Sequence, residues 1–170
     1  QIYVRTKSKK LKSLGLVSET IRLDADVAEQ KLLSIIKDLN ANSKFHGILV
    51  QMPLPEHSNS QNVINSMNPL KDVDGFHPEN VGWLSIGKPR FIPCTPKGIM
   101  RIFSHYNIDL TGKDIVVIGR SNIVGRPMSI LVSSNNANGT CTVCHSRTKN
   151  INDYLRNADI IISAIGVPNL

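Results

Sequence analysis

The spacing of apolar residues along the chain predicts which segments are helices and which are strands. Apolar residues that recur every three or four positions predict amphipathic helices, whereas short unbroken apolar runs predict buried strands. Helical spacing occurs in segments 3–14, 27–39, 61–67, 97–106 and 151–157, and it resumes after position 127. Strand-like runs occur at 47–52, 115–118, 140–144 and 159–165, and segment 16–23 alternates loosely between apolar and polar residues, which also predicts a strand. Strands that alternate with helices in this way are typical of an α/β protein.

The order of these segments predicts two domains. In the second half of the chain, strand and helix alternate as they do in a doubly wound parallel sheet. A stiff Pro93-Cys94-Thr95-Pro96 link precedes that half. We therefore expect an N-terminal α/β catalytic domain over 1–94 and a Rossmann-like domain with a doubly wound parallel sheet over 95–170. Because the chain starts at Gln1 and stops just after a strand-like run, we expect it to be a fragment of a longer protein.

A glycine turn follows the strand-like run 115–118. The run ends at Gly119, a second glycine follows at Gly125, and helical spacing resumes after position 127. At such a junction the free N–H groups and the positive end of the helix dipole would attract a phosphate. The standard dinucleotide fingerprint also needs glycine at two positions where this chain has Ser121 and Val124. A nucleotide site is the favoured interpretation, and a plain turn is the alternative.

The residues after the run 140–144 favour one form of dinucleotide. A fold that binds NAD usually places an acidic residue there, which holds the ribose 2′-hydroxyl. This chain has Ser146 and Arg147 instead, and Arg120 lies in the glycine turn. A hydroxyl and guanidinium groups bind a 2′-phosphate, which a carboxylate would repel. The pattern therefore favours NADP over NAD.

Composition and charge exclude several classes of protein. The net charge of +7 would suit nucleic acid, but aromatic residues make up only 5% of the chain and offer little for bases to stack on. A basic surface also suits small anionic ligands. No apolar run approaches the roughly 20 residues that cross a bilayer. We therefore expect neither a nucleic-acid partner nor a membrane span.

Cysteines and acidic residues give no sign of a metal site. The three cysteines are an odd number, which favours a reducing compartment over a disulfide framework. Cys141 and Cys144 have C-x-x-C spacing, but residues three apart on a strand face opposite sides. Asp72 and Asp74 are two apart, as in a calcium loop, but the other ligand positions of that loop are missing. We predict structural thiols and no metal.

Three polar residues have alternative interpretations when considered singly. Lys7 lies in a run of basic residues, so it could simply be a solvent-exposed lysine. Gln51 ends a predicted strand, where ligands bind in open α/β sheets, although a structural amide is equally consistent with that position. Asp74 precedes Gly75, as in a simple turn.

Five motifs, in one order along the chain, resemble a single family. They are Tyr3-Val4-Arg5-Thr6-Lys7, Val50-Gln51-Met52-Pro53-Leu54-Pro55, Lys71-Asp72-Val73-Asp74-Gly75, Pro93-Cys94-Thr95-Pro96 and Gly119-Arg120-Ser121-Asn122-Ile123-Val124-Gly125-Arg126-Pro127. Together they resemble the bifunctional methylenetetrahydrofolate dehydrogenase/methenyltetrahydrofolate cyclohydrolase family. The altered glycine turn is the form that this family uses. Family members also extend beyond both ends of this chain.

The resemblance implies a role for each matching residue. Tyr3 would pack against the folate rings, and Asp74 would anchor the pterin. Lys7 would be the central catalytic group with Gln51 as its hydrogen-bond partner, and Val50 would line the substrate site. NADP would be held by Gly119, Arg120, Ser121, Ile123, Gly125, Ser146 and Arg147.

The implied activity is one-carbon folate metabolism in support of purine biosynthesis. NADP⁺ would oxidise 5,10-methylenetetrahydrofolate, and hydrolysis of the methenyl product would give 10-formyltetrahydrofolate. Burial beside the cationic substrate would favour the neutral amine of Lys7, which could then act as a base. The resemblance also implies a homodimer. We expect a cytoplasmic protein, with an organelle as the alternative.

Three other interpretations are open. The chain could be another NADP-dependent dehydrogenase, although that class does not explain the match at Tyr3, Lys7, Gln51 and Asp74 together. It could be a family member with dehydrogenase activity only, against which the presence of Lys7 argues. A basic nucleic-acid-binding module would show binding that depends steeply on salt.

Overall fold

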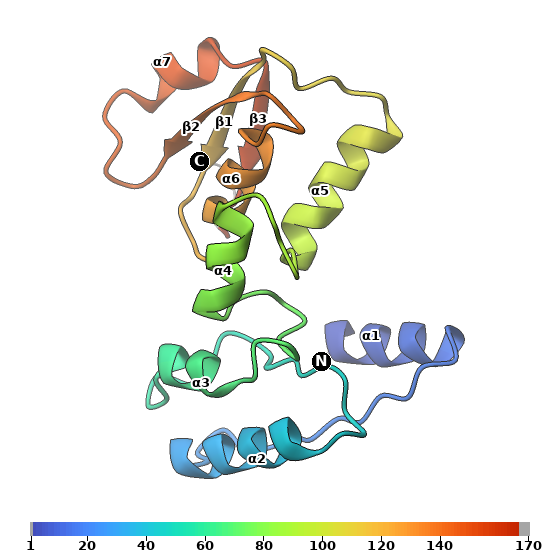
Figure 1. Cartoon of the computed structure of the whole chain (residues 1–170). Helices are drawn as coiled ribbons and strands as arrows, with labels where there is room; N and C mark the ends of the chain where they lie inside the picture. Colours follow the sequence, from blue (N-terminus) through green and yellow to red (C-terminus); the bar gives the residue numbers. More distant parts are fainter. Residues whose placement is uncertain (1, 167–170) are drawn as a thin grey trace.

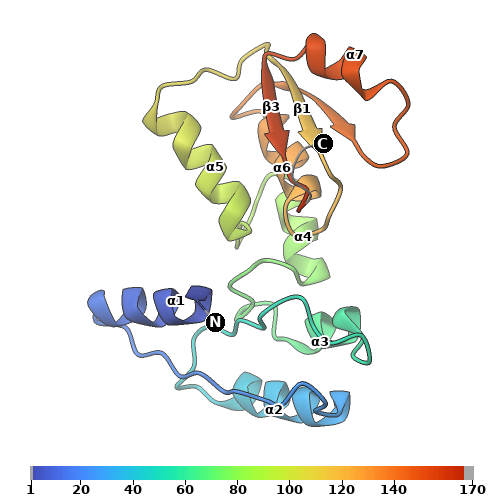
Figure 2. The ribbon, with the colours of Figure 1, turned by 180° about the vertical axis from the view of Figure 1, so that it is seen from behind.

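The computed structural model describes residues 2–166, with the side chains of Ile2 and Tyr3 outside that description. The helices are α1 (Ile2–Ser13), α2 (Glu29–Ala41), α3 (Ser60–Ser66), α4 (Pro78–Ser85), α5 (Cys94–His105), α6 (Gly125–Val132) and α7 (Ile151–Arg156). The strands are β1 (Asp114–Ile118), β2 (Thr140–Cys144) and β3 (Ile160–Ser163). Figure 1 shows two parts: a lower one with α1 to α3, and an upper one with the sheet and α5 to α7. Helix α4 lies between them in both Figure 1 and the reverse view of Figure 2, and it contacts α6.

The upper part is built on a parallel sheet with the order β2-β1-β3. Strand β1 pairs with β2 from Asp114↔Thr140 to Ile118↔Cys144, and with β3 from Ile115↔Ile160. The central strand is buried on both faces, as its unbroken apolar run predicts. The predicted doubly wound parallel sheet is confirmed, with strand boundaries within two residues of the predicted ones.

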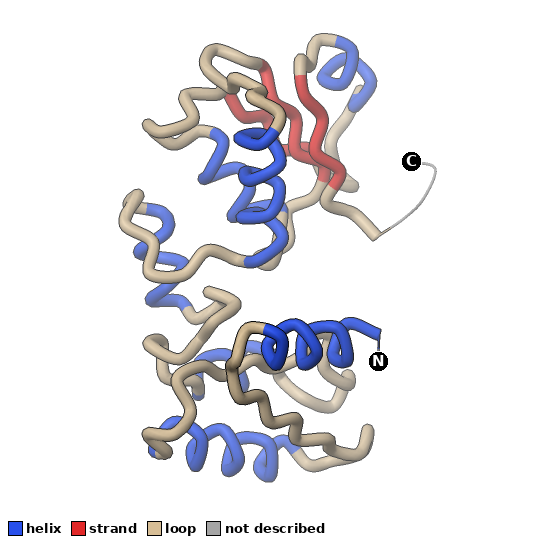
Figure 3. Tube along the Cα trace, turned by 90° about the vertical axis from the view of Figure 1, so that its right-hand side faces the viewer, coloured by secondary structure: helices blue, strands red, loops and turns tan. Residues whose placement is uncertain are grey.

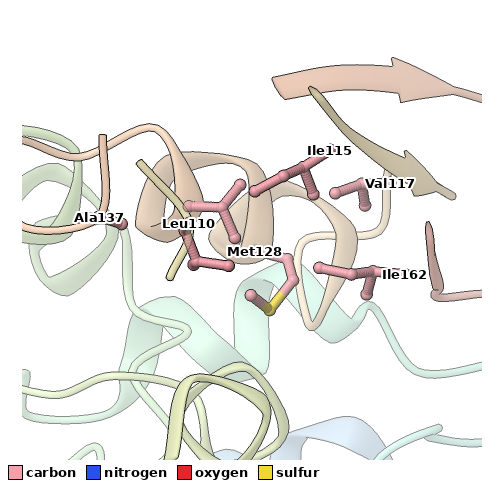
Figure 4. Packing of buried hydrophobic residues seen from close by; sticks show 7 residues of the cluster. Leu110, Ile115, Val117, Met128, Ala137 and Ile162 are labelled. Atoms are coloured by element: carbon pink, nitrogen blue, oxygen red, sulfur yellow. The ribbon is translucent and has the colours of Figure 1, made fainter. Parts of the chain in front are cut away.

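Helices cover both faces of this sheet. Ile115 and Val117 face α5 and α6, in a core cluster completed by Leu110, Met128, Val132, Ala137 and Ile162 (Figure 4). Val116 and Ile118 point to the other face, where Cys144 packs with residues of α7. Side chains alternate between the faces because successive Cβ atoms of a strand point in opposite directions. In Figure 3 the red strands lie between blue helices on either side.

The lower part has a core but, among its described residues, no continuous ladder of strand pairs. Ile36, Ile48, Val63 and Met67 form the buried cluster between α2 and α3. The predicted strand 47–52 is reduced to one parallel bridge, Ile48↔Asp72.

The predicted strand 16–23 is wrong, because the described structure has no strand or bridge in that segment. Val17 is 98% exposed, and an extended segment without a neighbour leaves its N–H and C=O groups to water.

Two helices differ from the prediction. The prediction missed α4, which begins at Pro78 after His77, whose ring accepts a hydrogen bond from Glu79 N. Proline at the first helical position is favourable because it has no N–H to leave unpaired. Helix α5 begins at Cys94, three residues before the predicted start, because Pro96 is tolerated in a first turn.

Among the residues described, no helix is both long enough and apolar enough to cross a bilayer. Cys94, Cys141 and Cys144 are free thiols.

Candidate functional site

Lys7 and Gln51 meet although they are far apart in the sequence. The Lys7 Nζ atom donates to Gln51 Oε1 at 3.5 Å, across 44 positions of the chain. The Gln51 amide also donates to the carbonyl of Met52 at 3.1 Å, which orients its oxygen toward the lysine. Both side chains are exposed. The contact brings the middle of α1 to the end of the extended segment that starts at Ile48.

The same segment is tied to the loop that carries Asp74. Ile48 N donates to Lys71 O at 2.7 Å, and Val73 N donates to Ile48 O at 3.4 Å. Gly47 allows this approach, because a Cβ at that position would lie 2.5 Å from a Val73 methyl carbon. Two parallel segments therefore end side by side, one near Gln51 and the other near Asp74.

Asp74 is half-buried at the end of its segment, and two charges act on it. Burial raises the pKa of its carboxyl above the usual range, the Lys7 ammonium opposes that rise, and the Asp72 carboxylate adds to it. Lys7 therefore acts on Asp74 through its charge, and the bridge between the segments of Gln51 and Asp74 places these two residues at the same end. Lys7, Gln51 and Asp74 therefore form one cluster, which we call the lysine cluster, drawn from three separate segments.

The two other residues predicted at this site are less informative. The backbone of Tyr3 belongs to α1, and its side chain lies outside the described part of the chain. The side chain of Val50 is partly buried and packs against the core cluster between α2 and α3. Both roles stay predictions.

The glycine turn at the end of β1 leaves no room for a side chain at either of its two glycines. Gly119 has a φ of +114°, and a Cβ there would lie 2.6 Å from Ala164 O, just beyond β3. A Cβ on Gly125 would collide with the Gly119 carbonyl and with Arg120 Cα. Gly119 is therefore required by its positive φ and by the close approach of Ala164, and Gly125 by the close packing of the start of α6 against the end of β1.

One expectation about this turn is wrong. The first N–H groups of α6 were expected to be free for a phosphate, but Ser121 occupies them. Its Oγ accepts from Val124 N at 3.1 Å and from Gly125 N at 3.4 Å, and its carbonyl accepts from Arg126 N at 3.0 Å. Pro127, next in the helix, has no N–H. An anion at this turn would have to be bound by the N–H groups of residues 120–123, which donate to nothing in the described structure, and by side chains.

The polar residues beyond β1 and β2 lie at matching positions. Ile118 pairs with Cys144, so Arg120 and Ser146 each lie two residues beyond the paired ends. The loop after β2 is closed by His145 N donating to Thr148 Oγ1 and by Thr148 N donating to His145 O, both at 2.8 Å.

Arg120, Ser146 and Arg147 are exposed on these loops. The ion pairs in the described structure are Arg90–Glu79 and Lys113–Asp159, so neither Arg120 nor Arg147 is neutralised by a carboxylate. We call these three residues the basic cluster. It fits a bound phosphate group.

No group of three or more potential metal ligands occurs among the described residues.

Sequence reasoning missed two polar residues near the lysine cluster, Asp72 and Asn80, which are completely buried. The Asp-x-Asp spacing drew attention to Asp72, but no local pattern indicates that it is buried.

Models of known protein domains match the two regions that contain these clusters. The model of the tetrahydrofolate dehydrogenase/cyclohydrolase catalytic domain matches residues 1–74, and the model of that family's NAD(P)-binding domain matches residues 93–170. The chain belongs to the tetrahydrofolate dehydrogenase/cyclohydrolase family. The lysine cluster lies in the first matched region and the basic cluster in the second. The predicted family and the two-domain α/β class are confirmed, whereas the boundary at residue 94 stays a prediction.

Individual relatives agree with this assignment. The bifunctional protein FolD of Staphylococcus saprophyticus is 52% identical over 170 residues, which are 100% of this chain and 59% of the relative. The chain therefore spans about three fifths of the length of that relative.

Two solved structures have the same fold. The bifunctional enzyme FolD from Campylobacter jejuni matches with a TM-score of 0.94 and 47% identity, over 100% of this chain and 60% of that one. The Trypanosoma brucei enzyme, complexed with NADP cofactor and inhibitor, matches with a TM-score of 0.93 and 36% identity, over 99% of this chain and 57% of that one.

Proposed function

We propose that the protein catalyses two consecutive steps of one-carbon folate metabolism. The first is the NADP-dependent oxidation of 5,10-methylenetetrahydrofolate to 5,10-methenyltetrahydrofolate, and the second is hydrolysis of that product to 10-formyltetrahydrofolate. Membership of the family supports both steps. The observation that carries the proposal is the contact of Lys7 Nζ with Gln51 Oε1 at 3.5 Å, beside Asp74, because it brings an amine, an amide and a carboxyl to one place.

The lysine cluster is the proposed folate site. In its ionised form Asp74 would accept hydrogen bonds from the amino group and ring N–H of the pterin. The ring of Tyr3 would pack against the folate rings, and Val50 would line the site through its backbone. The substrate would then lie with its one-carbon bridge near Lys7.

The basic cluster is the proposed site of the cofactor's 2′-phosphate. Arg120 and Arg147 carry charges that no described carboxylate neutralises, and Ser146 adds a hydroxyl. Gly119, Ser121, Ile123 and Gly125 would shape the turn against the rest of the cofactor. When bound, NADP⁺ supplies the hydride acceptor for the oxidation.

The hydrolytic step would depend on Lys7. Its neutral amine would take a proton from water as the water oxygen bonds to the methenyl carbon. The bond from that carbon to the ring nitrogen N5 would then break as the added hydroxyl loses its proton to become the formyl C=O. N5 would take up that proton, and the Lys7 ammonium would release the proton it accepted to solvent. Gln51 would hold the amine in place without adding charge. Lys7 is exposed in this structure, so the burial that favours its neutral form would have to come from the bound substrate.

The assay needs a protein of full family length. A chimera in which this chain replaces the matching segment of the S. saprophyticus relative has that length. The chimera would receive 5,10-methylenetetrahydrofolate with NADP⁺ or NAD⁺, and absorbance would follow reduced cofactor and the methenyl product. We expect NADPH with little methenyl accumulation. Accumulation of methenyl product would indicate a dehydrogenase only, and no turnover with either cofactor would contradict the proposal.

Three further features belong to the same proposal. The catalytic domain would span residues 1–94 and the NADP-binding domain residues 95–170, and the protein would form a homodimer. The three free cysteines support a reducing compartment, for which we propose the cytoplasm.

A further inference from the structure

Asp72 is a buried carboxylate that nothing in the proposed reaction uses. It is 0% exposed, and no ion pair of the described structure includes it. Three N–H donors solvate it instead. Its Oδ1 accepts from Gly75 N at 3.1 Å, and its Oδ2 accepts from His77 N at 2.8 Å and from Asn80 Nδ2 at 2.9 Å. Burying a charge without an opposite charge is costly, so its position calls for a physical reason.

The three bonds close the turn on which Asp74 lies. Asp74 is the second residue between Asp72 and Gly75, and the backbone of Gly75 also donates to Asp72 O at 3.2 Å. Gly75 has a φ of +70°, and a Cβ there would meet the Phe91 carbonyl at 3.2 Å. The direction in which Asp74 leaves the backbone is therefore set by the carboxylate two residues before it.

The neighbouring lysine does not neutralise Asp72. Lys71 Nζ instead donates to the carbonyls of Leu39, Asn40 and Asn42 at 2.8 to 2.9 Å, at the end of α2. The side chains of Lys71 and Asp72 thus point in opposite directions. Lys71 binds the end of α2, and Asp72 binds the turn that follows it and Asn80 of α4. Only the Asp72 side closes the turn that carries Asp74.

Asn80 completes the arrangement from α4. It is 0% exposed, its amide nitrogen also donates to Pro69 O at 2.9 Å, and its oxygen accepts from Arg90 Nη1 at 3.2 Å. Because every polar atom of Asn80 is used, the amide cannot turn away from Asp72 without losing other bonds.

We propose that Asp72 is a positioning residue for Asp74: its buried carboxylate closes the turn and holds the Asp74 carboxyl beside Lys7, where the folate substrate would bind. This role rests on the proposed function. Asp72 would not touch the substrate. Its contribution would be to reduce the freedom of Asp74 before the substrate arrives.

The charge of Asp72 also acts on Asp74. In the described structure the charged groups that act on Asp74 are Lys7 from α1 and Asp72 from its own segment. Burial and Asp72 raise the pKa of Asp74, so its ionised form is lost, as the pH falls, earlier than for an exposed aspartate. Replacement of Asp72 by asparagine removes one raising cause, so that loss should move to lower pH.

The first test needs no activity and uses this chain itself. In Asp72→Asn we expect the NMR titration midpoint of the Asp74 carboxyl to fall, and amide exchange of Gly75 and His77 to become about tenfold faster, because their acceptor is weakened. Asp109→Asn is the matched control, since Asp109 is an exposed aspartate that accepts from Thr111 N. The control should change neither reading.

The second test uses the chimera and its reaction. Asp72→Asn should raise KM for 5,10-methylenetetrahydrofolate about tenfold and leave KM for NADP⁺ unchanged, with kcat within about threefold. A residue that only stabilises the fold would lower the melting temperature without changing KM or the Asp74 midpoint, and that result would overturn the proposal. A chimera without folate-dependent turnover would contradict the proposed function, while the NMR arm would still decide the role of Asp72.

A second variant covers the case in which Asp72→Asn does not fold. Asn80→Ala keeps the carboxylate and removes one of its three donors. We expect faster amide exchange at His77, which shares Oδ2 with Asn80, and a KM for the folate raised about threefold. Unchanged exchange and unchanged KM in Asn80→Ala would overturn the proposal.

Discussion

The two parts of the molecule build their clusters in different ways. In the upper part, Arg120 lies in the glycine turn directly after Gly119, and the five residue pairs of β1 and β2 bring Ser146 to the same edge of the sheet. In the lower part, Lys7 and Gln51 are 44 positions apart, and the one described strand-like pairing there is the bridge Ile48↔Asp72.

This difference predicts where each part is vulnerable. The glycines of the packed turn are part of the fold, so substitutions at them should destabilise the protein, whereas the exposed side chains beside the turn can be removed without unfolding. A site built from exposed side chains on separate segments should lose its chemistry while the fold persists. The following substitutions, from the largest expected effect to the smallest, test that difference.

Lys7→Met should separate chemistry from stability most clearly. We expect the cyclohydrolase rate of the chimera to fall by roughly 10²- to 10⁴-fold, the usual contribution of a general base. The free energy of unfolding should change by less than about 0.5 kcal/mol, because Lys7 is exposed. Lys12→Met on the same helix is the matched control for both measurements. Undiminished hydrolysis would remove Lys7 from the mechanism.

Gly125→Ala should instead lower the stability of the fold. The new Cβ would collide with the Gly119 carbonyl and Arg120 Cα, both backbone atoms, so we expect a loss of about 3 kcal/mol in urea unfolding. Gly98→Ala in α5 is the control, because a Cβ there meets nothing within 4 Å. That control should be neutral, or stabilising by about 0.5 to 1 kcal/mol. Equal stability of the two variants would contradict the packing argument.

Arg147→Ala should change cofactor selectivity without unfolding the protein. Loss of a charge-assisted bond to the 2′-phosphate should weaken NADP⁺ binding by about tenfold or more, and NAD⁺ binding should be unaffected. Titration of the chimera with each cofactor measures both. Arg156→Ala removes the same charge at the end of α7 and should preserve the selectivity. If both variants weaken NADP⁺ binding equally, the net charge of the surface would explain the loss, and Arg147 would have no specific contact with the 2′-phosphate.

Ser121→Ala should have the smallest effect. Its hydroxyl accepts from Val124 N and Gly125 N at the start of α6, so its loss should cost about 1 kcal/mol in urea unfolding. Ser133→Ala is a control. Ser133 lies directly after the last residue of α6, and its hydroxyl donates to Ser129 O, so it does not affect the start of the helix. A loss no larger than in that control would mean that the hydroxyl does not stabilise the turn.

The apolar pattern was sufficient to predict most of the upper part. The strands β1, β2 and β3 and the helices α6 and α7 each have a periodicity of their own, and parallel strands joined by helices have few possible arrangements. The lower part was predicted less well, because segments 16–23 and 47–52 have strand-like composition. A strand, however, also needs a paired neighbour, and composition does not supply one.

The sequence by itself determined the α/β class and the doubly wound sheet. Through five ordered motifs, it also determined the family. The family resemblance also implied that Gln51 is the hydrogen-bond partner of Lys7, a bond that the structure shows. Only the tertiary structure decided that the Lys7 charge acts on Asp74, that Ser121 occupies the start of α6, and that Asp72 is buried. The physical reason is the sequence separation over which each effect acts: periodicity and turn chemistry depend on residues only a few positions apart. Burial, hydrogen-bond partners and pKa shifts depend on segments that only folding brings together.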